Sequence, residues 1–223
     1  MIDPGPIFLS LALAGVTTLI LLLIGTPLAW WLANSRSQIR PAVEAMTAMP
    51  LILPPTVLGF YFLVLLGPAA PIGRFWLELT GSTLTFSFSG LVVASLFYSL
   101  PFMVQPLQAA FENVGPKPME AAASLGASRL DAFFNVVVPL TRRSFLVAAV
   151  LCFAHTIGEF GVVLMVGGNI PGETRVLSIA IYEHVETLDY AQAHVLSAGL
   201  LLFSFLTLLL VYTQQRGVRF GVR

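Results

Sequence analysis

Long apolar stretches constrain this sequence more than any other feature. A helix that crosses the hydrocarbon core of a bilayer needs about 20 predominantly apolar residues. Five stretches meet this requirement: residues 7–33, 43–66, 86–111, 144–166 and 194–212. Only 10% of the residues are charged, whereas soluble domains carry about 25%. The sequence therefore predicts an all-α polytopic membrane protein, in which residues 1–223 form one transmembrane domain with five transmembrane helices.

The composition also excludes several classes of protein. Eleven basic and eleven acidic residues give a net charge of zero, so nucleic acid is not a natural partner. The single cysteine, Cys152, lies in an apolar stretch, and we expect a buried side chain rather than a reactive thiol. No Gly-x-Ser-x-Gly or His-Glu-x-x-His sequence is present, so we expect no intramembrane enzyme, metal site or cofactor. No basic segment precedes the first apolar stretch, which favours a retained span over a secretory signal peptide.

The distribution of positive charge sets an orientation. Only Arg74 and Arg175 fall on one side of a five-span threading. The other nine basic residues share the opposite side: Arg36, Arg40, Lys117, Arg129, Arg142, Arg143, Arg216, Arg219 and Arg223. Because basic loops stay in the cytoplasm, the N-terminus is expected outside and the C-terminus inside. The apolar run at residues 176–185 is too short to span, so we expect a re-entrant or interfacial helix on the outer side.

The loop between the third and fourth spans carries signals for two short helices. Pro118 can occupy the first turn of a helix, with Glu120 near its positive N-terminal end. Gly126 permits the left-handed turn that ends such a helix. Ser128 with Asp131 three residues later resembles a capping box, which starts the next helix. These residues predict a helix, a sharp turn and a second helix on the cytoplasmic side.

The same loop resembles the loop signature of bacterial ABC importer permeases. The matching pattern is Glu120-Ala-Ala, three residues, Gly126, nine residues, then Val136-x-Val138-Pro139, with valines replacing the more usual Ile and Leu. The resemblance implies a type I ABC importer permease fold, in which residues 112–143 hold a coupling helix seated in a groove of a cytoplasmic ATPase subunit. The residues that it assigns to this contact are Glu120, Ala121, Ala122, Gly126 and Ala127.

A second resemblance concerns the cargo. Gly158-Glu-Phe-Gly161 and Asn169-Ile-Pro-Gly-Glu-Thr-Arg175 look like the molybdate branch of these permeases, and sulfate permeases share part of the pattern. The resemblance implies a homodimer in the bacterial inner membrane that imports molybdate delivered by an extracytoplasmic binding protein. Tungstate, sulfate and thiosulfate are the alternative cargoes. An ATP-independent carrier is a further alternative, although such carriers usually show repeats and intramembrane charges.

Glu159 is unusual because it lies inside an apolar stretch. An ionisable residue at membrane depth is costly and marks a functional-site hypothesis. His155 precedes it by four residues, so the two could pair on one helix face. They could line or gate the transport path, or they could pack helices, with flanking glycines permitting close approach. The candidates for the pathway or gate are Ser99, Thr156, Gly158, Glu159 and Gly161.

Prolines within the spans predict kinks. Pro50, Pro54 and Pro55 lie in the second span, and Pro101 and Pro106 lie in the third. The kinks could be hinges for alternating access or fixed bends, and the residues favour neither.

The segment at residues 167–174 has the glycine spacing of a phosphate-binding loop, but Glu173 stands where such a loop needs lysine. We therefore expect no ATP site in this chain and a separate ATPase subunit as the energy source. The outer side is acidic and would not steer a dianion in from solution. Recognition is thus expected in the binding protein. It would contact an outer gate loop, residues 167–193, through Asn169, Glu173 and Arg175.

Overall fold

The computed structural model describes residues 3–216, with side chains from 3 to 213, and this part of the chain is helical without strands. A 3-10 turn, Met49–Leu51, follows the second helix, and a π-helical turn, Phe133–Val137, precedes the eighth. The helices are α1 (Gly5–Asn34), α2 (Arg40–Ala48), α3 (Pro55–Leu66), α4 (Pro71–Thr80), α5 (Phe88–Val114), α6 (Lys117–Ser124), α7 (Arg129–Ala132), α8 (Val138–Gly158), α9 (Gly161–Gly167), α10 (Leu177–Glu186) and α11 (Tyr190–Arg216).

Within the described residues, four helical segments are long and apolar enough to cross a membrane: Gly5–Asn34, Phe88–Val114, Arg129–Gly158 and Tyr190–Thr213. The first three of them, containing α1, α5 and α8, pack around a shared apolar core. Leu21, Met103 and Cys152, one from each of these helices, are fully buried in that core. The expected burial of Cys152 is confirmed. α11 contacts the rest of the bundle mainly through α10 and α8 and remains largely exposed along its apolar length.

The second apolar stretch is sharply broken. The sequence predicts one kinked span across residues 43–66. The structure shows a much stronger bend, of 110°, between Arg40–Leu51 and Pro55–Leu66; counted together as one broken span, these helices bring the candidate spans of the described residues to the expected five. Pro54 is extended, with ψ 134°, and Pro55 starts α3. Because proline has no backbone N–H, neither residue can donate the hydrogen bond that a continuous helix needs. By contrast, both prolines of the third span lie within the uninterrupted helix α5.

The fourth apolar stretch is also broken, although its sequence predicts a continuous span. Helix α8 ends at Gly158, Glu159 is extended with ψ 132°, and α9 begins at Gly161. The expected continuous span across residues 144–166 is therefore wrong beyond Gly158. The short helix expected at residues 176–185 is present as α10 (Leu177–Glu186).

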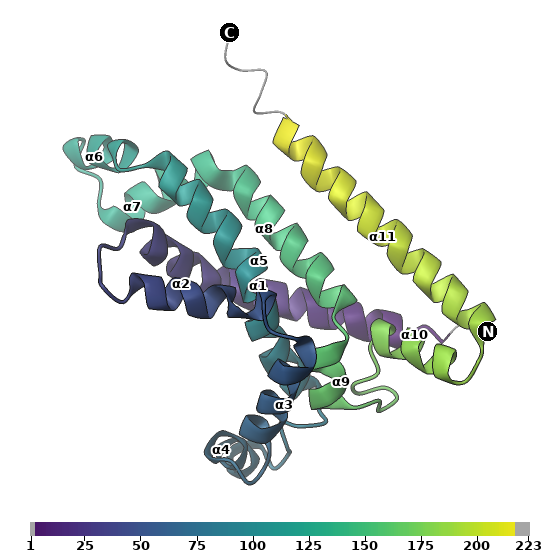
Figure 1. Ribbon diagram of the computed structural model, residues 1–223. Helices are drawn as coiled ribbons and strands as arrows, with labels where there is room; N and C mark the ends of the chain where they lie inside the picture. Colours follow the sequence, from purple (N-terminus) through teal and green to yellow (C-terminus); the bar gives the residue numbers. More distant parts are fainter. Residues whose placement is uncertain (1–2, 217–223) are drawn as a thin grey trace.

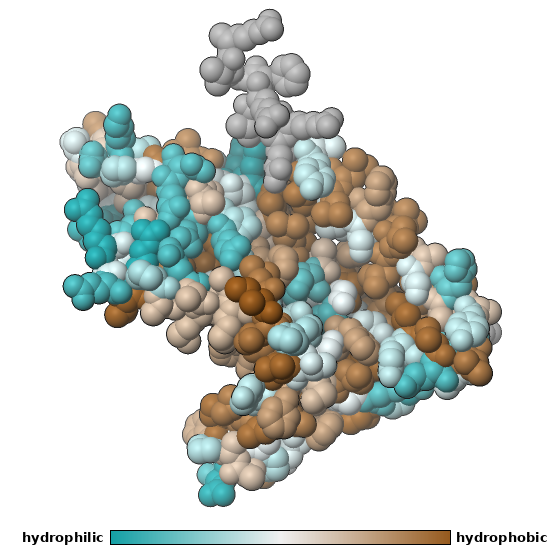
Figure 2. Space-filling model, in the orientation of Figure 1, coloured by the Kyte–Doolittle hydropathy of each residue, from teal (hydrophilic) through white to brown (hydrophobic). Residues whose placement is uncertain are grey.

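The bundle has two distinct ends (Figure 1). Helices α6 and α7 lie at one end, together with the start of α2 and the end of α5. Helices α4, α9 and α10 and the start of α11 lie toward the other. Figure 2 shows hydrophilic residues gathered over the α6–α7 end and hydrophobic ones over α11 and α3. The first end is called the loop end below, and the second is called the α10 end.

Candidate functional site

The loop end carries the predicted helix, turn and second helix. Helix α6 ends at Ser124, and Gly126 adopts the left-handed conformation, with φ +87°. The backbone N–H of Ala127 donates to the carbonyl of Ala122 at 3.0 Å, which closes the turn. The Ser128 hydroxyl then accepts from the Asp131 N–H at 3.2 Å and caps α7. The local signals in the sequence thus predict the geometry of this segment.

The expected coupling residues are not all equally accessible. Glu120, Ala121 and Gly126 are exposed, whereas Ala122 is buried and Ala127 is half-buried. Three exposed apolar side chains of the same segment were not predicted from the sequence. Leu125, Leu130 and Phe134 are 89%, 72% and 61% exposed. Apolar side chains this exposed in a polar segment usually mark an interaction surface.

An ion-pair network holds the loop end together. Arg40 at the start of α2 donates to Glu112 near the end of α5 at 2.7 Å and to Glu44 at 2.9 Å. The Gln108 side-chain amide donates to the same two carboxylates, at 2.7 Å to Glu44 and 3.2 Å to Glu112. The network fixes α2 against the last turn of α5, which leads into α6 through only two residues.

At the α10 end, the glycine-rich segment at residues 167–175 forms a turn held by its own hydrogen bonds. The Ile170 carbonyl accepts from the backbone N–H groups of Glu173, Thr174 and Arg175. The fully buried Thr174 hydroxyl accepts from the Ile170 N–H at 3.0 Å and donates to the Gly167 carbonyl at 2.8 Å. These internal bonds occupy the N–H groups of the last three residues, so the segment is a compact turn that presents Glu173 on its surface.

The three expected binding-protein contacts lie on or near this turn. Asn169 and Glu173 are exposed, and Arg175 is partly exposed. Arg175 donates to the Asn169 side-chain oxygen at 2.7 Å and pairs with Glu183 on α10 at 3.2 Å. The Asn169 amide donates to the same Glu183 carboxylate at 3.2 Å. This network joins the turn to α10.

The middle of the bundle contains a buried polar seam, formed by Ser95 and Ser99 on α5 and by His155, Thr156 and Glu159 beside them. The Ser95 hydroxyl donates to Glu159 Oε2 at 2.8 Å. The Ser99 hydroxyl lies 2.8 Å from the Thr156 hydroxyl and 3.1 Å from His155 Nδ1. Ser99, Thr156 and Glu159 are at most 3% exposed. In this conformation three of the five pathway candidates are therefore enclosed between helices.

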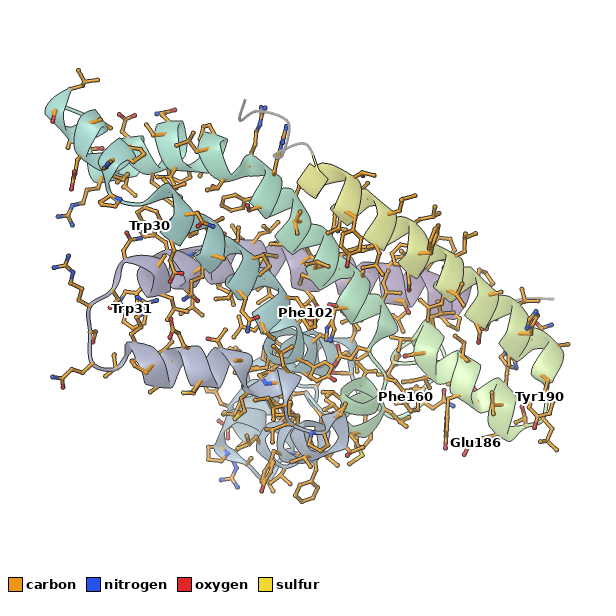
Figure 3. All side chains as sticks on the ribbon, turned by 45° about the horizontal axis from the view of Figure 1, so that its top comes forward. Trp30, Trp31, Phe102, Phe160, Glu186 and Tyr190 are labelled. Carbon is orange, nitrogen blue, oxygen red and sulfur yellow. The ribbon has the colours of Figure 1, made fainter. Side chains whose placement is uncertain are left out.

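The predicted pairing of His155 with Glu159 is wrong. Spacing of four residues brings side chains together only within one helix, and α8 ends at Gly158, before Glu159. Their side chains form no ion pair in the described part of the chain; each bonds to a different serine of α5. His155 also stacks on Phe102, with ring centroids 3.9 Å apart. Along the bundle, Phe102 lies between Trp30 toward the loop end and Tyr190 at the α10 end (Figure 3).

The description "Binding-protein-dependent transport system inner membrane component" belongs to a family model that matches residues 25–220. The chain belongs to this family. It is thus a multi-pass permease of the bacterial inner membrane.

Curated relatives extend over most of the permease. The molybdenum transport system permease protein ModB of Azotobacter vinelandii is 58% identical over 214 residues, 96% of this chain and 95% of that protein. ModB of Escherichia coli K12 is 36% identical over 181 residues, 81% of this chain and 79% of that protein. The sulfate transport system permease protein CysT of Synechocystis sp. is 34% identical over 199 residues, 89% of this chain and 69% of that protein.

Solved structures support the fold. A bacterial ABC transporter involved in the import of the acidic polysaccharide alginate has a TM-score of 0.67 at 17% identity, covering 98% of this chain and 79% of that chain. The MetNI methionine ABC transporter in an inward-facing conformation has a TM-score of 0.66 at 19% identity, covering 98% and 95%. At such identities the likeness shows the fold alone, and the expected type I ABC importer permease fold is confirmed.

The two glycines flanking Glu159 in the permease have different surroundings. A Cβ atom at Gly161 would lie 2.8 Å from the Cβ of Pro55, so α9 and the start of α3 approach closely there. One turn along α3, a Cβ at Gly59 would lie 2.6 Å from the Cβ of Met165. Among the described residues, a Cβ at Gly158 would meet nothing within 4 Å. Close packing therefore explains Gly161 and leaves Gly158 unexplained.

Proposed function

We propose that this permease is the membrane subunit of an ATP-driven importer that translocates molybdate delivered by an extracytoplasmic binding protein. The observation that carries the proposal is the 58% identity with a molybdenum transport permease over 96% of the chain. A shared fold does not assign a cargo, because importers of unrelated cargoes have the same fold. Sequence identity of 58% along nearly the whole chain favours the cargo of that relative.

The α6–α7 segment is the proposed docking site for the ATPase subunit. It presents Glu120, Ala121 and Gly126 to solvent beside the exposed side chain of Leu125. Ala122 and Ala127 hold the turn in shape. The basic residues gathered at this end favour a cytoplasmic loop end, with the N-terminus outside and the C-terminus inside. ATP hydrolysis then takes place in the docked subunit and not in this chain.

We further propose a homodimer in which two copies supply two docking sites and enclose one path. The single transmembrane domain of residues 1–223 would contribute one half of that path. The seam residues Ser99, Thr156 and Glu159 hold helices together, because they are enclosed and bonded to one another or to α5. Gly158 is exposed and has room beside it, so it is the one of the five candidates that could border the path.

Sulfate or thiosulfate is the second candidate cargo. Its support is the 34% identity with a sulfate permease, which spans 89% of this chain but only 69% of that protein. Tungstate remains a further candidate because it is a tetrahedral dianion of nearly the same size as molybdate. The lower identity and coverage place sulfate behind molybdate.

Reconstitution in proteoliposomes with the ATPase subunit tests the cargo. ATP hydrolysis is measured with binding protein loaded with molybdate, tungstate or sulfate, and with unloaded binding protein as control. We expect strong stimulation by the molybdate-loaded protein and little by the sulfate-loaded one. Stimulation by sulfate alone would move the assignment to the second candidate. No stimulation by any oxyanion would contradict the proposed function.

A matched pair of glycine variants tests the docking site. Gly126 and Gly172 both have positive φ, +87° and +80°, and a Cβ atom added at either position would meet nothing within 4 Å. Gly126→Asp and Gly172→Asp therefore introduce the same side chain under similar backbone strain at opposite ends of the molecule. We expect Gly126→Asp to lose ATPase binding and coupled transport while Gly172→Asp keeps ATPase binding. Normal ATPase binding by Gly126→Asp would refute the assigned docking site.

A further inference from the structure

Glu159 is held at three points, at the break between α8 and α9. Its carboxyl group accepts from Ser95 on α5 at 2.8 Å. Its backbone carbonyl accepts from the Ser178 hydroxyl on α10, and its N–H donates to the Thr156 carbonyl at 3.3 Å. The second carboxyl oxygen, Oε1, is buried and has no hydrogen-bond partner among the residues that the structure describes. A buried polar atom left unpaired is costly in a native structure and requires an explanation.

These bonds connect the two ends of the permease. Helix α5 carries Ser95 and runs to Val114, and α6 starts at Lys117. A displacement of α6 therefore reaches α5 through a two-residue link. A hydrogen bond connects Ser95 on α5 to the Glu159 carboxyl group, and a second connects the Glu159 carbonyl to Ser178 on α10. Along the chain, α5 and α10 are joined only through α6, α7, α8, α9 and the turn before α10.

The break between α8 and α9 determines how this connection can move. A helix interrupted at Glu159 and Phe160 lacks the continuous backbone hydrogen bonds that keep α8 and α9 aligned. Such a position absorbs rotations that an intact helix resists. The Glu159 side chain adds a polar attachment to α5 at the break, beside the apolar packing of α9 against the same helix.

We propose that Glu159 is a positioning residue. Its hydrogen bond to Ser95 holds the break between α8 and α9 against α5, so that α10 and the glycine-rich turn at residues 167–175 move together with the coupling helix α6. The proposal rests on the proposed function, in which α6 receives the movement of the ATPase. Ser178 also lines a groove of about 520 Å³ between α10 and α11, so the movement of α10 changes the shape of that groove.

Distances between spin labels in the reconstituted complex test this role. Lys117→Cys reports on the start of α6, away from the named docking residues, and Val185→Cys reports on α10. Both residues are exposed, and the fully buried Cys152 stays unlabelled. Each label in the homodimer gives one distance between the two copies. In the parent protein we expect ATP binding to change both distances. With Glu159→Ala the α6 distance still changes and the α10 distance does not, and stimulation of ATP hydrolysis by loaded binding protein falls about 5-fold or more.

Two further variants separate positioning from general stability. Glu159→Gln keeps an acceptor for Ser95 and is expected to retain both distance changes. Ser10→Ala removes the hydroxyl that accepts from the Leu177 N–H at 2.7 Å. It therefore weakens the attachment of α10 to α1 without touching the seam, and both distance changes persist. Should Glu159→Ala fail to assemble, Ser178→Ala carries the same test, because it removes the bond between the hinge and α10.

The outcomes are distinguishable. An α10 distance that still changes in both Glu159→Ala and Ser178→Ala overturns the positioning role. The same holds if Ser10→Ala abolishes the α10 change as fully as they do. An α6 distance that stays fixed in the parent protein overturns the proposed coupling function, and the hinge proposal falls with it.

Discussion

The close approach of α9 to α3 makes a quantitative prediction for Gly161→Ala. The new Cβ would lie 2.8 Å from the Cβ of Pro55 and 3.6 Å from its carbonyl carbon. Carbon atoms pack best at about 3.5–4.0 Å, so α3 and α9 must separate by about 1 Å at this point. The ring of Pro55 cannot rotate away as a flexible side chain would.

The cost follows from the packing around this contact. Inserting one methyl group into a packed interior typically costs about 1–3 kcal/mol. A second close contact one turn away, between Gly59 and Met165, resists the separation of the two helices. We therefore expect Gly161→Ala to lower the free energy of unfolding by about 1–3 kcal/mol, or the melting temperature by about 2–12 °C at roughly 2–4 °C per kcal/mol.

Gly158→Ala is the matched control, since it makes the same chemical change three residues earlier. Nothing lies within 4 Å of its new Cβ, and it occupies the last residue of α8. Replacing glycine by alanine in a helix is neutral or stabilising by up to about 1 kcal/mol. Denaturation of both purified variants in mixed micelles measures the difference. If Gly161→Ala is as stable as Gly158→Ala, α9 does not press against α3 and the reasoning is wrong.

Three further predictions concern the two ends of the permease. Thr174→Val should lower the free energy of unfolding by about 1–3 kcal/mol, because the buried Gly167 carbonyl and the Ile170 N–H lose their partner. Chemical denaturation measures this change, and an unchanged midpoint would contradict the described turn. Ser128→Ala should lower stability by about 1 kcal/mol through loss of the α7 cap, whereas Ser128→Asp should restore it; equal stability of all three proteins would rule out the cap. Arg40→Glu should weaken the attachment of α2 to α5 and reduce coupled ATP hydrolysis, and adding Glu112→Arg should recover part of that hydrolysis. If the double variant hydrolyses ATP no faster than the single one, the ion pair does not act in coupling.

The loop segment was predictable because its signals are local. Pro118, Gly126 and Ser128 each act within four residues of their own position, so the order of residues alone specifies helix, turn and cap. The α10 segment was predictable for a related reason, since its apolar run is too short to span a membrane.

The break at Glu159 was not predictable by the same means. Gly158-Glu-Phe-Gly161 lies within an apolar run, and hydropathy averaged over a spanning length passes across it. The partners that stabilise the break are Ser95, 64 residues away, and Ser178, 19 residues away. Such partners depend on tertiary packing, so the sequence offered His155 as the nearest neighbour and led to the wrong pairing.

The exposed apolar side chains at the loop end limit how the permease can exist in a cell. Leu125 and Leu130 stand in water whenever no other protein covers them, and uncovered apolar surface promotes association with unintended partners. A cell that makes this subunit in excess of its intended partner would accumulate a self-associating protein in its membrane. If α6 and α7 dock the ATPase subunit as proposed, we therefore expect the permease to self-associate when it is produced without that subunit.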